Sequence, residues 1–196
     1  MKIAILGSGI GSNAQAIINA ADSNQIGNAE IVGIFSDIEN APILLHARKK
    51  DIYSKHIQTS KNSCSIEGKD EELWLNEIQK VNPDLIVLAG FMRILKSKFI
   101  NSAANRIINL HPSLLPSFPG LNSIKRAFDK KVKITGCTVH WVNESIDGGE
   151  IIAQAPVRIM NGDTFELVKQ KVHAAEHMLL PWVIKDLSQG IIPFPE

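Results

Sequence analysis

The stretch Asp84-Leu-Ile-Val-Leu-Ala-Gly90 (DLIVLAG) has only apolar residues between its first and last positions. Its side chains do not alternate between apolar and polar, so an extended chain here would need cover on both faces. That pattern is typical of a strand in a parallel sheet with helices packed on both sides. The stretch therefore indicates an α/β sheet.

The sequence on either side of DLIVLAG fits that expectation. Three further short apolar runs are found: KIAIL (2–6), EIVGIFS (30–36) and RIINL (106–110). Stretches with helical spacing lie between the runs: 13–24, 41–50 and 71–81. Strands that alternate with helices predict a mostly parallel, Rossmann-like sheet with helices on both faces.

The last third of the chain has a different pattern. The stretches 133–142 and 150–159 are long and alternate in parts between apolar and polar residues, and NESIDGGE (143–150) separates them. Alternation of this kind favours antiparallel pairing. We therefore expect an antiparallel strand pair added to the parallel sheet near the C-terminus, with a long loop between the two strands.

A final helix is predicted over 163–180. Asp163 is its expected N-cap, and Glu166 three positions later completes a capping box. Turning by about 100° per residue places Glu176 beside the apolar stripe, on the same flank as His173. A polar flank of this kind can border a cleft.

Length and composition narrow the class of protein. The 196 residues suit one domain, and a net charge of +1 does not favour nucleic acid or a membrane as partner. The apolar runs are far shorter than the roughly 20 residues of a membrane span, and no signal segment is recognised. Cys64 and Cys137 lack a C-x-x-C spacing, which favours a reducing, cytoplasmic setting. We expect a monomer or a homodimer.

GSGIGSN (7–13) stands between a predicted strand and a predicted helix. Glycines let the backbone approach a ligand, and the free amides of a helix N-terminus attract phosphate. Gly7 and Gly9 fit the dinucleotide fingerprint, with Asp37 as a possible ribose-binding acid, but Ser12 fills the third glycine position. A phosphate-binding loop is favoured over a dinucleotide site, and a simple tight turn is the alternative.

NLHPSLLP (109–116) ends a predicted strand with two polar residues, Asn109 and His111, on one face. An Asn amide can donate to a developing oxyanion, and a carboxylate such as Asp147 would orient His111 and favour its protonated form. The set fits attack on a carbonyl carbon. Nothing marks Ser113 as an activated nucleophile, so a direct transfer is favoured over an acyl-enzyme.

The remaining histidines and cysteines are interpreted as structural. His140 and Cys137 fall within a predicted strand and are expected to be satisfied sheet positions. His173 and His177 are four residues apart on a helix, but the H-E-x-x-H pattern is absent. We therefore expect no metal site.

Four motifs together resemble the phosphoribosylglycinamide formyltransferase family, over essentially the whole chain: GSGIGSN, LAGFMRIL, NLHPSLLPSFPG and SIDGGEII. NLHPSLLP with a downstream DGG is also shared with methionyl-tRNA formyltransferases and formyltetrahydrofolate deformylases of the same formyl-folate superfamily. GSN, FMRIL and the chain length favour the first family.

The resemblance implies transfer of a formyl group from 10-formyltetrahydrofolate to the amine of N1-(5-phospho-D-ribosyl)glycinamide, in de novo purine biosynthesis. The folate would be a cosubstrate, and no tightly bound cofactor is implied. Gly11, Ser12 and Asn13 would bind the substrate phosphate, and Glu176 would contact the same substrate. Asn109, His111 and Asp147 would be the catalytic set.

The resemblance also assigns the folate pocket to two segments. They are Met92, Arg93, Ile94 and Leu95, largely through backbone groups, and the loop residues Asn143, Glu144 and Asp147. Residues 1–100 would form a nucleotide-binding half and 101–196 a catalytic and folate-binding half. The Leu115-Pro116 bond resembles one that is cis in this family.

Two departures from the family pattern stand out. Glu67 occupies the place of an Arg that helps to hold substrate, with Lys61 and Lys69 nearby, and we assign it no role. Asn122-Ser123-Ile124 stands where a His-containing stretch is usual. Two other functions stay open: a 10-formyltetrahydrofolate deformylase, and a nucleotide-binding regulatory domain without chemistry.

Overall fold

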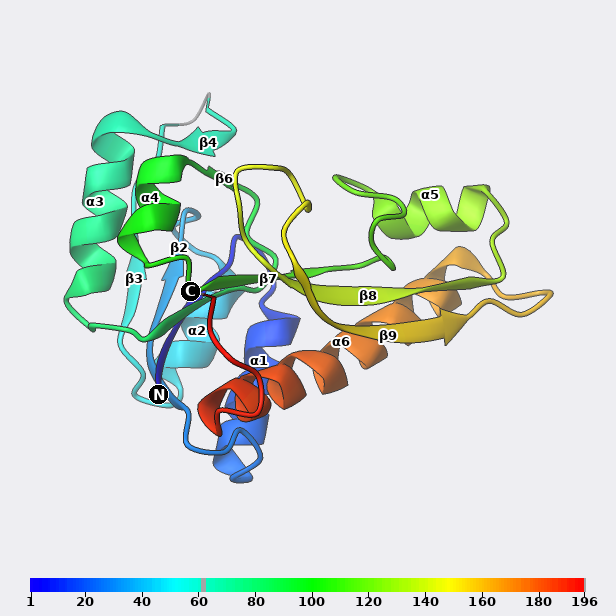
Figure 1. Cartoon of the computed structure of the whole chain (residues 1–196), viewed down its shortest axis with the longest axis horizontal. Coiled ribbons are helices and arrows are strands. Elements are labelled where there is room, and N and C mark those ends of the chain that lie inside the picture. The colour runs from blue at the N-terminus through cyan, green and yellow to red at the C-terminus, as the bar shows by residue number, and fades with distance from the viewer. Residues whose placement is uncertain (61–62, 196) are drawn as a thin grey trace.

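A seven-stranded sheet runs through the part of the chain that the computed structural model describes, residues 1–60 and 63–195 (Figure 1). Its strand order is β3-β2-β1-β5-β7-β8-β9. In chain order the strands are β1 (Lys2–Leu6), β2 (Glu30–Ser36), β3 (Ser54–His56), β5 (Leu85–Leu88), β7 (Ile107–His111), β8 (Ile134–Trp141) and β9 (Ile151–Arg158). Neighbouring strands from β3 to β7 are parallel, and β8 and β9 are antiparallel to their neighbours. The predicted sheet class is confirmed.

Helices cover both faces of this sheet: α1 (Ser12–Asp22), α2 (Pro42–Arg48), α3 (Gly68–Gln79), α4 (Ser97–Ser102), α5 (Ser123–Asp129) and α6 (Phe165–Ser188). Leu85 and Val87 of β5 belong to the core under α1, α2 and α6. Ile86 and Leu88 belong to the core under α3 and α4. The strand is apolar without alternation because each of its faces is buried.

Several short elements escape the sequence patterns. β4 (Ser65–Ile66) and β6 (Ile94–Leu95) form a separate two-stranded parallel sheet. These strands, together with β3, α4 and α5, are too short for a period of two or of 3.6 to be recognised. The missed elements matter because β6 lies within the FMRIL motif.

The last helix, α6, differs from its prediction at both ends. Its N-cap is Thr164, whose side chain accepts a hydrogen bond from the Leu167 amide, so the predicted Asp163 cap is wrong by one residue. The helix also continues through Pro181 to Ser188. An internal proline costs about 3 kcal/mol. Burial of the apolar side chains that follow it, about 1.5–3 kcal/mol each, outweighs that cost. None of the helices described is long and apolar enough to cross a membrane.

β8 and β9 extend beyond the parallel part of the sheet. β8 pairs with β7 only through residues 138–141, and the rest of it pairs with β9 alone. The two strands project as a ribbon that α5 and the first half of α6 accompany (Figure 1). β9 is an edge strand, and Pro156 within it lies opposite Gly136 of β8.

Candidate functional site

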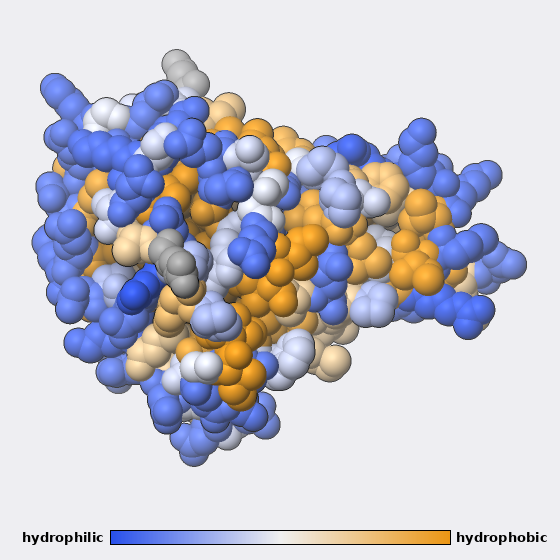
Figure 2. All heavy atoms as spheres, viewed as in Figure 1, coloured by the Kyte–Doolittle hydropathy of each residue, from blue (hydrophilic) through white to orange (hydrophobic). Residues whose placement is uncertain are grey.

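A cavity of about 750 Å³ lies where the C-terminal ends of β5 and β7 meet the loop between β8 and β9. Both halves of the chain line it, and its rim carries three exposed apolar side chains, Met92, Leu121 and Ile146. Apolar side chains are visible between the wider part of the molecule and the projecting ribbon (Figure 2). A second hollow, about 1030 Å³, lies between α1 and α6 and contains none of Asn109, His111 and Asp147.

Asp147 is the centre of the polar cluster in this cavity. Its Oδ2 lies 3.1 Å from His111 Nδ1 and accepts a 2.7 Å hydrogen bond from the Gly120 amide. Its Oδ1 lies 3.3 Å from Asn109 Nδ2 and 3.6 Å from His140 Nε2. Burial alone would raise the pKa of Asp147. The neighbouring His140 and His111 rings and the hydrogen bond from the Gly120 amide oppose burial and hold the pKa of Asp147 below its usual value.

The local sequence explains how Asp147 reaches this position. Its φ is +50°, in the left-handed region that Asp tolerates better than most residues. Asn143 closes the loop, since its side chain accepts from the Ser145 amide and donates to the Gly148 carbonyl. A Cβ at Gly149 would lie 1.7 Å from the Trp141 carbonyl oxygen, so only glycine fits there. Glu144 also borders the cavity.

Asn109 and His111 come from β7, as the i, i+2 spacing predicted, and both border the cavity. His111 Nε2 lies 2.9 Å from the Phe118 carbonyl oxygen. Both of its ring nitrogens therefore face oxygen acceptors, which fixes the orientation of the ring. Asn109 Nδ2 lies near two acceptors, His140 Nε2 at 3.1 Å and Asp147 Oδ1.

His140 was expected to be a satisfied sheet position, and it belongs to the site as well. Its Nδ1 donates to the Trp141 carbonyl at 2.8 Å, which leaves Nε2 to accept from Asn109. The β7–β8 register places Asn109 directly opposite His140. Antiparallel pairing of NLH with TVHW was the signal that could have found it.

The GSGIGSN loop forms the turn before α1. Gly11 is the N-cap residue with φ +79°, and a Cβ there would lie 2.7 Å from side-chain atoms of Ile43. No side chain caps the helix, so the first amides of α1, from Ser12 and Asn13 onward, are directed at the end where an anion can bind. Asn13 borders the cavity and Ser12 borders the hollow beside it.

Glu176 faces the cavity from α6, as its place on the helix flank predicted. It is 3% exposed, and its Oε2 accepts from Asn13 Nδ2 at 3.1 Å and lies 2.9 Å from His173 Nδ1. His173 was missed as a site residue, although its i, i+3 spacing to Glu176 was the available signal. Within residues 1–60 and 63–195, no three His, Cys, Asp or Glu side chains gather as a metal ion requires.

The FMRIL residues Met92, Arg93, Ile94 and Leu95 all border the cavity. The Arg93 side chain bonds Asp37, with Nε 2.7 Å from Oδ2. Asp37 is buried and does not border the cavity, so it is not placed to act as the ribose-binding acid of a dinucleotide site.

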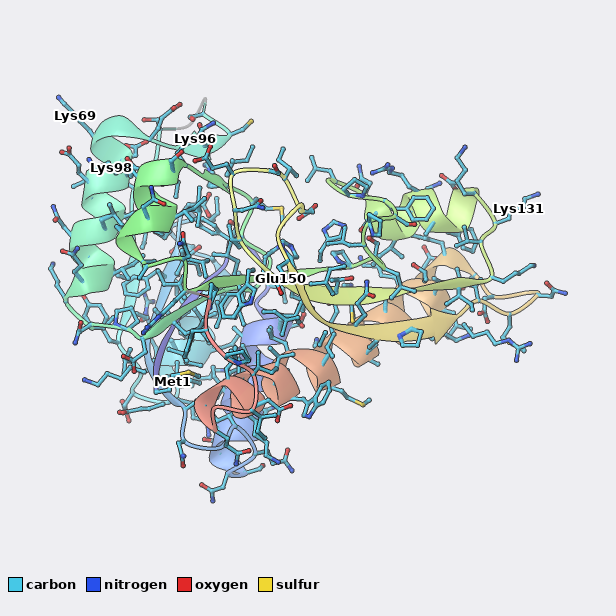
Figure 3. The ribbon with its side chains drawn as sticks, viewed as in Figure 1. Met1, Lys69, Lys96, Lys98, Lys131 and Glu150 are labelled. Atoms are coloured by element: carbon cyan, nitrogen blue, oxygen red, sulfur yellow. The ribbon has the colours of Figure 1, made fainter. Side chains whose placement is uncertain are left out.

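The two departures from the family pattern have clear positions. Glu67 is exposed, accepts a hydrogen bond from Ser65 and does not border the cavity. Lys61 lies outside the described residues, while Lys69 projects outward at the start of α3 (Figure 3). Ser123 is buried and donates to the Pro112 carbonyl at 3.1 Å. The Leu115-Pro116 bond is cis, as expected.

Comparison with known proteins agrees with this geometry. The formyl transferase family model matches residues 1–184. Phosphoribosylglycinamide formyltransferase of Escherichia coli (strain K12) is 39% identical over 196 residues, which are 100% of this chain and 91% of that protein. The crystal structure of glycinamide ribonucleotide transformylase 1 from Symbiobacterium toebii matches with a TM-score of 0.90 at 33% identity, over 100% of this chain and 91% of that one. The phosphoribosylglycinamide formyltransferase of Coxiella burnetii, solved in complex with CHES, matches with a TM-score of 0.92 at 36% identity, over 100% and 90%. The chain therefore belongs to the formyl transferase family.

Proposed function

We propose that this protein transfers the formyl group of 10-formyltetrahydrofolate to the amine of N1-(5-phospho-D-ribosyl)glycinamide, a step of de novo purine biosynthesis. One observation carries the proposal. The cluster of Asn109, His111 and Asp147 lies in a cavity that has an uncapped helix N-terminus on one side and the FMRIL segment on another. Such a cavity offers places for a phosphorylated acceptor and for a formyl donor around one set of acid–base groups.

The phosphate of the acceptor would bind the amides of Gly11, Ser12 and Asn13 at the start of α1. Glu176 lies beside that loop through its bond to Asn13, and its Oε2 already has two donors. Its Oε1 is left to accept from a ligand hydroxyl, as a ribose would provide. This arrangement fits a sugar phosphate better than a free phosphate ion.

The folate would occupy the part of the cavity bordered by residues 92–95 and by the 143–147 loop. Arg93 directs its guanidinium to Asp37, so this segment offers the ligand mainly backbone N–H and C=O groups. The exposed side chains of Met92, Leu121 and Ile146 give the rim apolar surface suited to a flat ring system.

The proposed formyl transfer depends on where charge develops as bonds form and break. The acceptor amine attacks the formyl carbon, a C–N bond forms, and the carbonyl oxygen becomes an oxyanion. Asn109 donates Nδ2–H to it, releasing the longer contact to Asp147. The bond from the formyl carbon to N10 of the folate then breaks. One proton leaves the attacking nitrogen and one reaches N10.

His111 is the group that carries the proton. Asp147 holds Nδ1, so Nε2 is the nitrogen that exchanges a proton with the substrates once they displace the Phe118 carbonyl. The carboxylate of Asp147 keeps the ring oriented while Nε2 takes up and releases the proton.

The proposal is tested by measuring formyl transfer from 10-formyltetrahydrofolate with and without the glycinamide ribonucleotide. We expect turnover that depends on the acceptor. If the donor loses its formyl group equally fast with and without the acceptor, the protein is a deformylase instead. Binding of the nucleotide with no turnover in either reaction would identify a regulatory domain.

A further inference from the structure

We propose that Asp37 is a positioning residue for the formyl donor: it holds the Arg93 side chain through Nε and thereby fixes the backbone of residues 90–95, which borders the cavity. The inference rests on the proposed function, because it takes this segment to contact the donor. Asp37 itself does not border the cavity, so it would act only through Arg93.

The contacts of Arg93 join three segments that are distant in sequence. Its Nε donates to Asp37 Oδ2 at 2.7 Å, just after the end of β2. Its Nη1 donates to the carbonyl oxygens of Ser63 and, at 3.5 Å, Ser60. The Asp37 side chain is 2% exposed and the Arg93 side chain 15% exposed, so water does little to weaken the pair.

The backbone on either side of Arg93 is also held in place. The Met92 amide donates to Ser8 Oγ at 2.9 Å, and the Ser8 amide donates to the Gly90 carbonyl at 3.0 Å. The Ile94 amide donates to the Cys64 carbonyl at 2.9 Å. Arg93 lies between these two attachments, and its side chain adds a further link from this segment to the end of β2 through Asp37.

The pair is not built for maximal stability. Asp37 Oδ1 is buried and has no hydrogen-bond partner within the described part of the chain. Burying a charged pair with an oxygen left unsatisfied is a weak source of stability, since desolvation opposes the attraction. The pair does hold the Arg93 side chain in one fixed geometry beside the cavity.

The test compares Asp37→Asn and the double variant Asp37→Leu/Arg93→Met with wild type. The double variant replaces the buried pair by apolar side chains, a change that folds generally tolerate. Asp22→Asn is the matched control, because Asp22 makes an equally short 2.7 Å ion pair with Lys50 that is about half exposed and far from residues 90–95. Thermal unfolding first establishes that each variant is folded.

Two measurements follow on the folded variants. Hydrogen exchange of the peptide covering residues 90–96, with no substrate present, reports whether the segment is still fixed. Steady-state kinetics separate the KM for the formyl donor from the KM for the acceptor and from kcat. We expect faster exchange in 90–96 and a donor KM raised roughly ten- to a hundredfold, the worth of a charged hydrogen bond. The acceptor KM should change little, and the Asp22 control should match wild type.

A general loss of stability would lower the amount of active enzyme, and it would not raise the KM for the formyl donor alone. Unchanged exchange in both variants, or faster exchange with an unchanged donor KM, would overturn the inference. These outcomes are distinct from failure of the proposed function, which would show as absent formyl transfer in the wild-type protein. The exchange measurement needs no substrate and tests the Asp37–Arg93 link in either case.

Discussion

The proposed phosphate-binding loop and the proposed catalytic cluster are built from different chemical groups. The loop of Gly11 to Asn13 uses backbone amides at a helix start, and its essential side-chain requirement is glycine at a position with φ +79°. The cluster uses side chains from β7, β8 and the loop after β8, all joined through Asp147. A site made of backbone should tolerate neutral side-chain changes, whereas a site made of interlocked side chains should not.

The largest expected effect breaks the catalytic cluster. Asp147→Asn keeps the shape of the side chain and removes the carboxylate charge that faces His111 Nδ1. Because misplaced acid–base help costs about 10²–10⁴ in rate, kcat should fall by that factor while the KM values for both substrates change little. Steady-state kinetics between about pH 6 and 9 check this. Near-normal kcat would show that Asp147 serves only to shape its loop.

The second prediction contrasts the two regions directly. Ser12→Asp places a carboxylate beside the expected phosphate, and like charges about 4 Å apart repel by about 1 kcal/mol or more. Affinity for the nucleotide should therefore fall about fivefold or more, with donor affinity unchanged. Ser12→Ala should bind almost as wild type, because the amide remains. Calorimetric titration measures the nucleotide affinity of both variants. If Ser12→Asp binds the nucleotide as tightly as wild type, the phosphate does not bind at this loop.

A smaller effect is expected at His140. His140→Gln removes the ring nitrogen that accepts from Asn109 and frees the amide to rotate. Loss of one hydrogen bond of about 1 kcal/mol should lower kcat by at most about fivefold, with KM unchanged. An unchanged kcat would mean that Asp147 alone positions Asn109.

The smallest effect is on stability against pH. The folded pKa of Asp147 is lower than its unfolded value of about 3.8, so Asp147 stabilises the fold above that value. This contribution is lost as the pH falls through the folded pKa. The stability that wild type has over Asp147→Asn because of this carboxylate should therefore shrink as the pH falls below about 4. Urea unfolding from pH 7 to 2.5 measures this, and a difference that does not change between about pH 4 and 2.5 would contradict the pKa direction.

The sheet could be predicted from sequence because its signals are local and repeated. The unbroken apolar run from Leu85 to Leu88 indicates by residue type that both faces of this strand are buried. Each alternation of strand and helix supports the same α/β sheet. The end of α6 could not, because the signal of Pro181 is local whereas the burial of Ile184 and Leu187 that outweighs it depends on tertiary packing. At this position, burial of apolar side chains in the core outweighed the low helix propensity of proline.

The candidate site divides in the same way. Asn109, His111 and Asp147 were found because their residue types suggest chemistry at recognisable spacing. His140 and the Asp37–Arg93 pair were missed because each depends on a partner distant in sequence, whereas His173 had its partner Glu176 three residues away on the same helix. A strand register, a helix flank or a loop path brings such partners together, and none of these is marked by the residue types alone.

The position of β9 at the edge of the sheet bears on self-association. An edge strand offers unpaired N–H and C=O groups that can template a strand from another molecule, the first step toward aggregates. Pro156 has no N–H, so it interrupts the row of donors in the middle of this eight-residue edge. The missing donor at Pro156 therefore disfavours edge-to-edge pairing of two copies along β9, the strand at which the extended sheet ends.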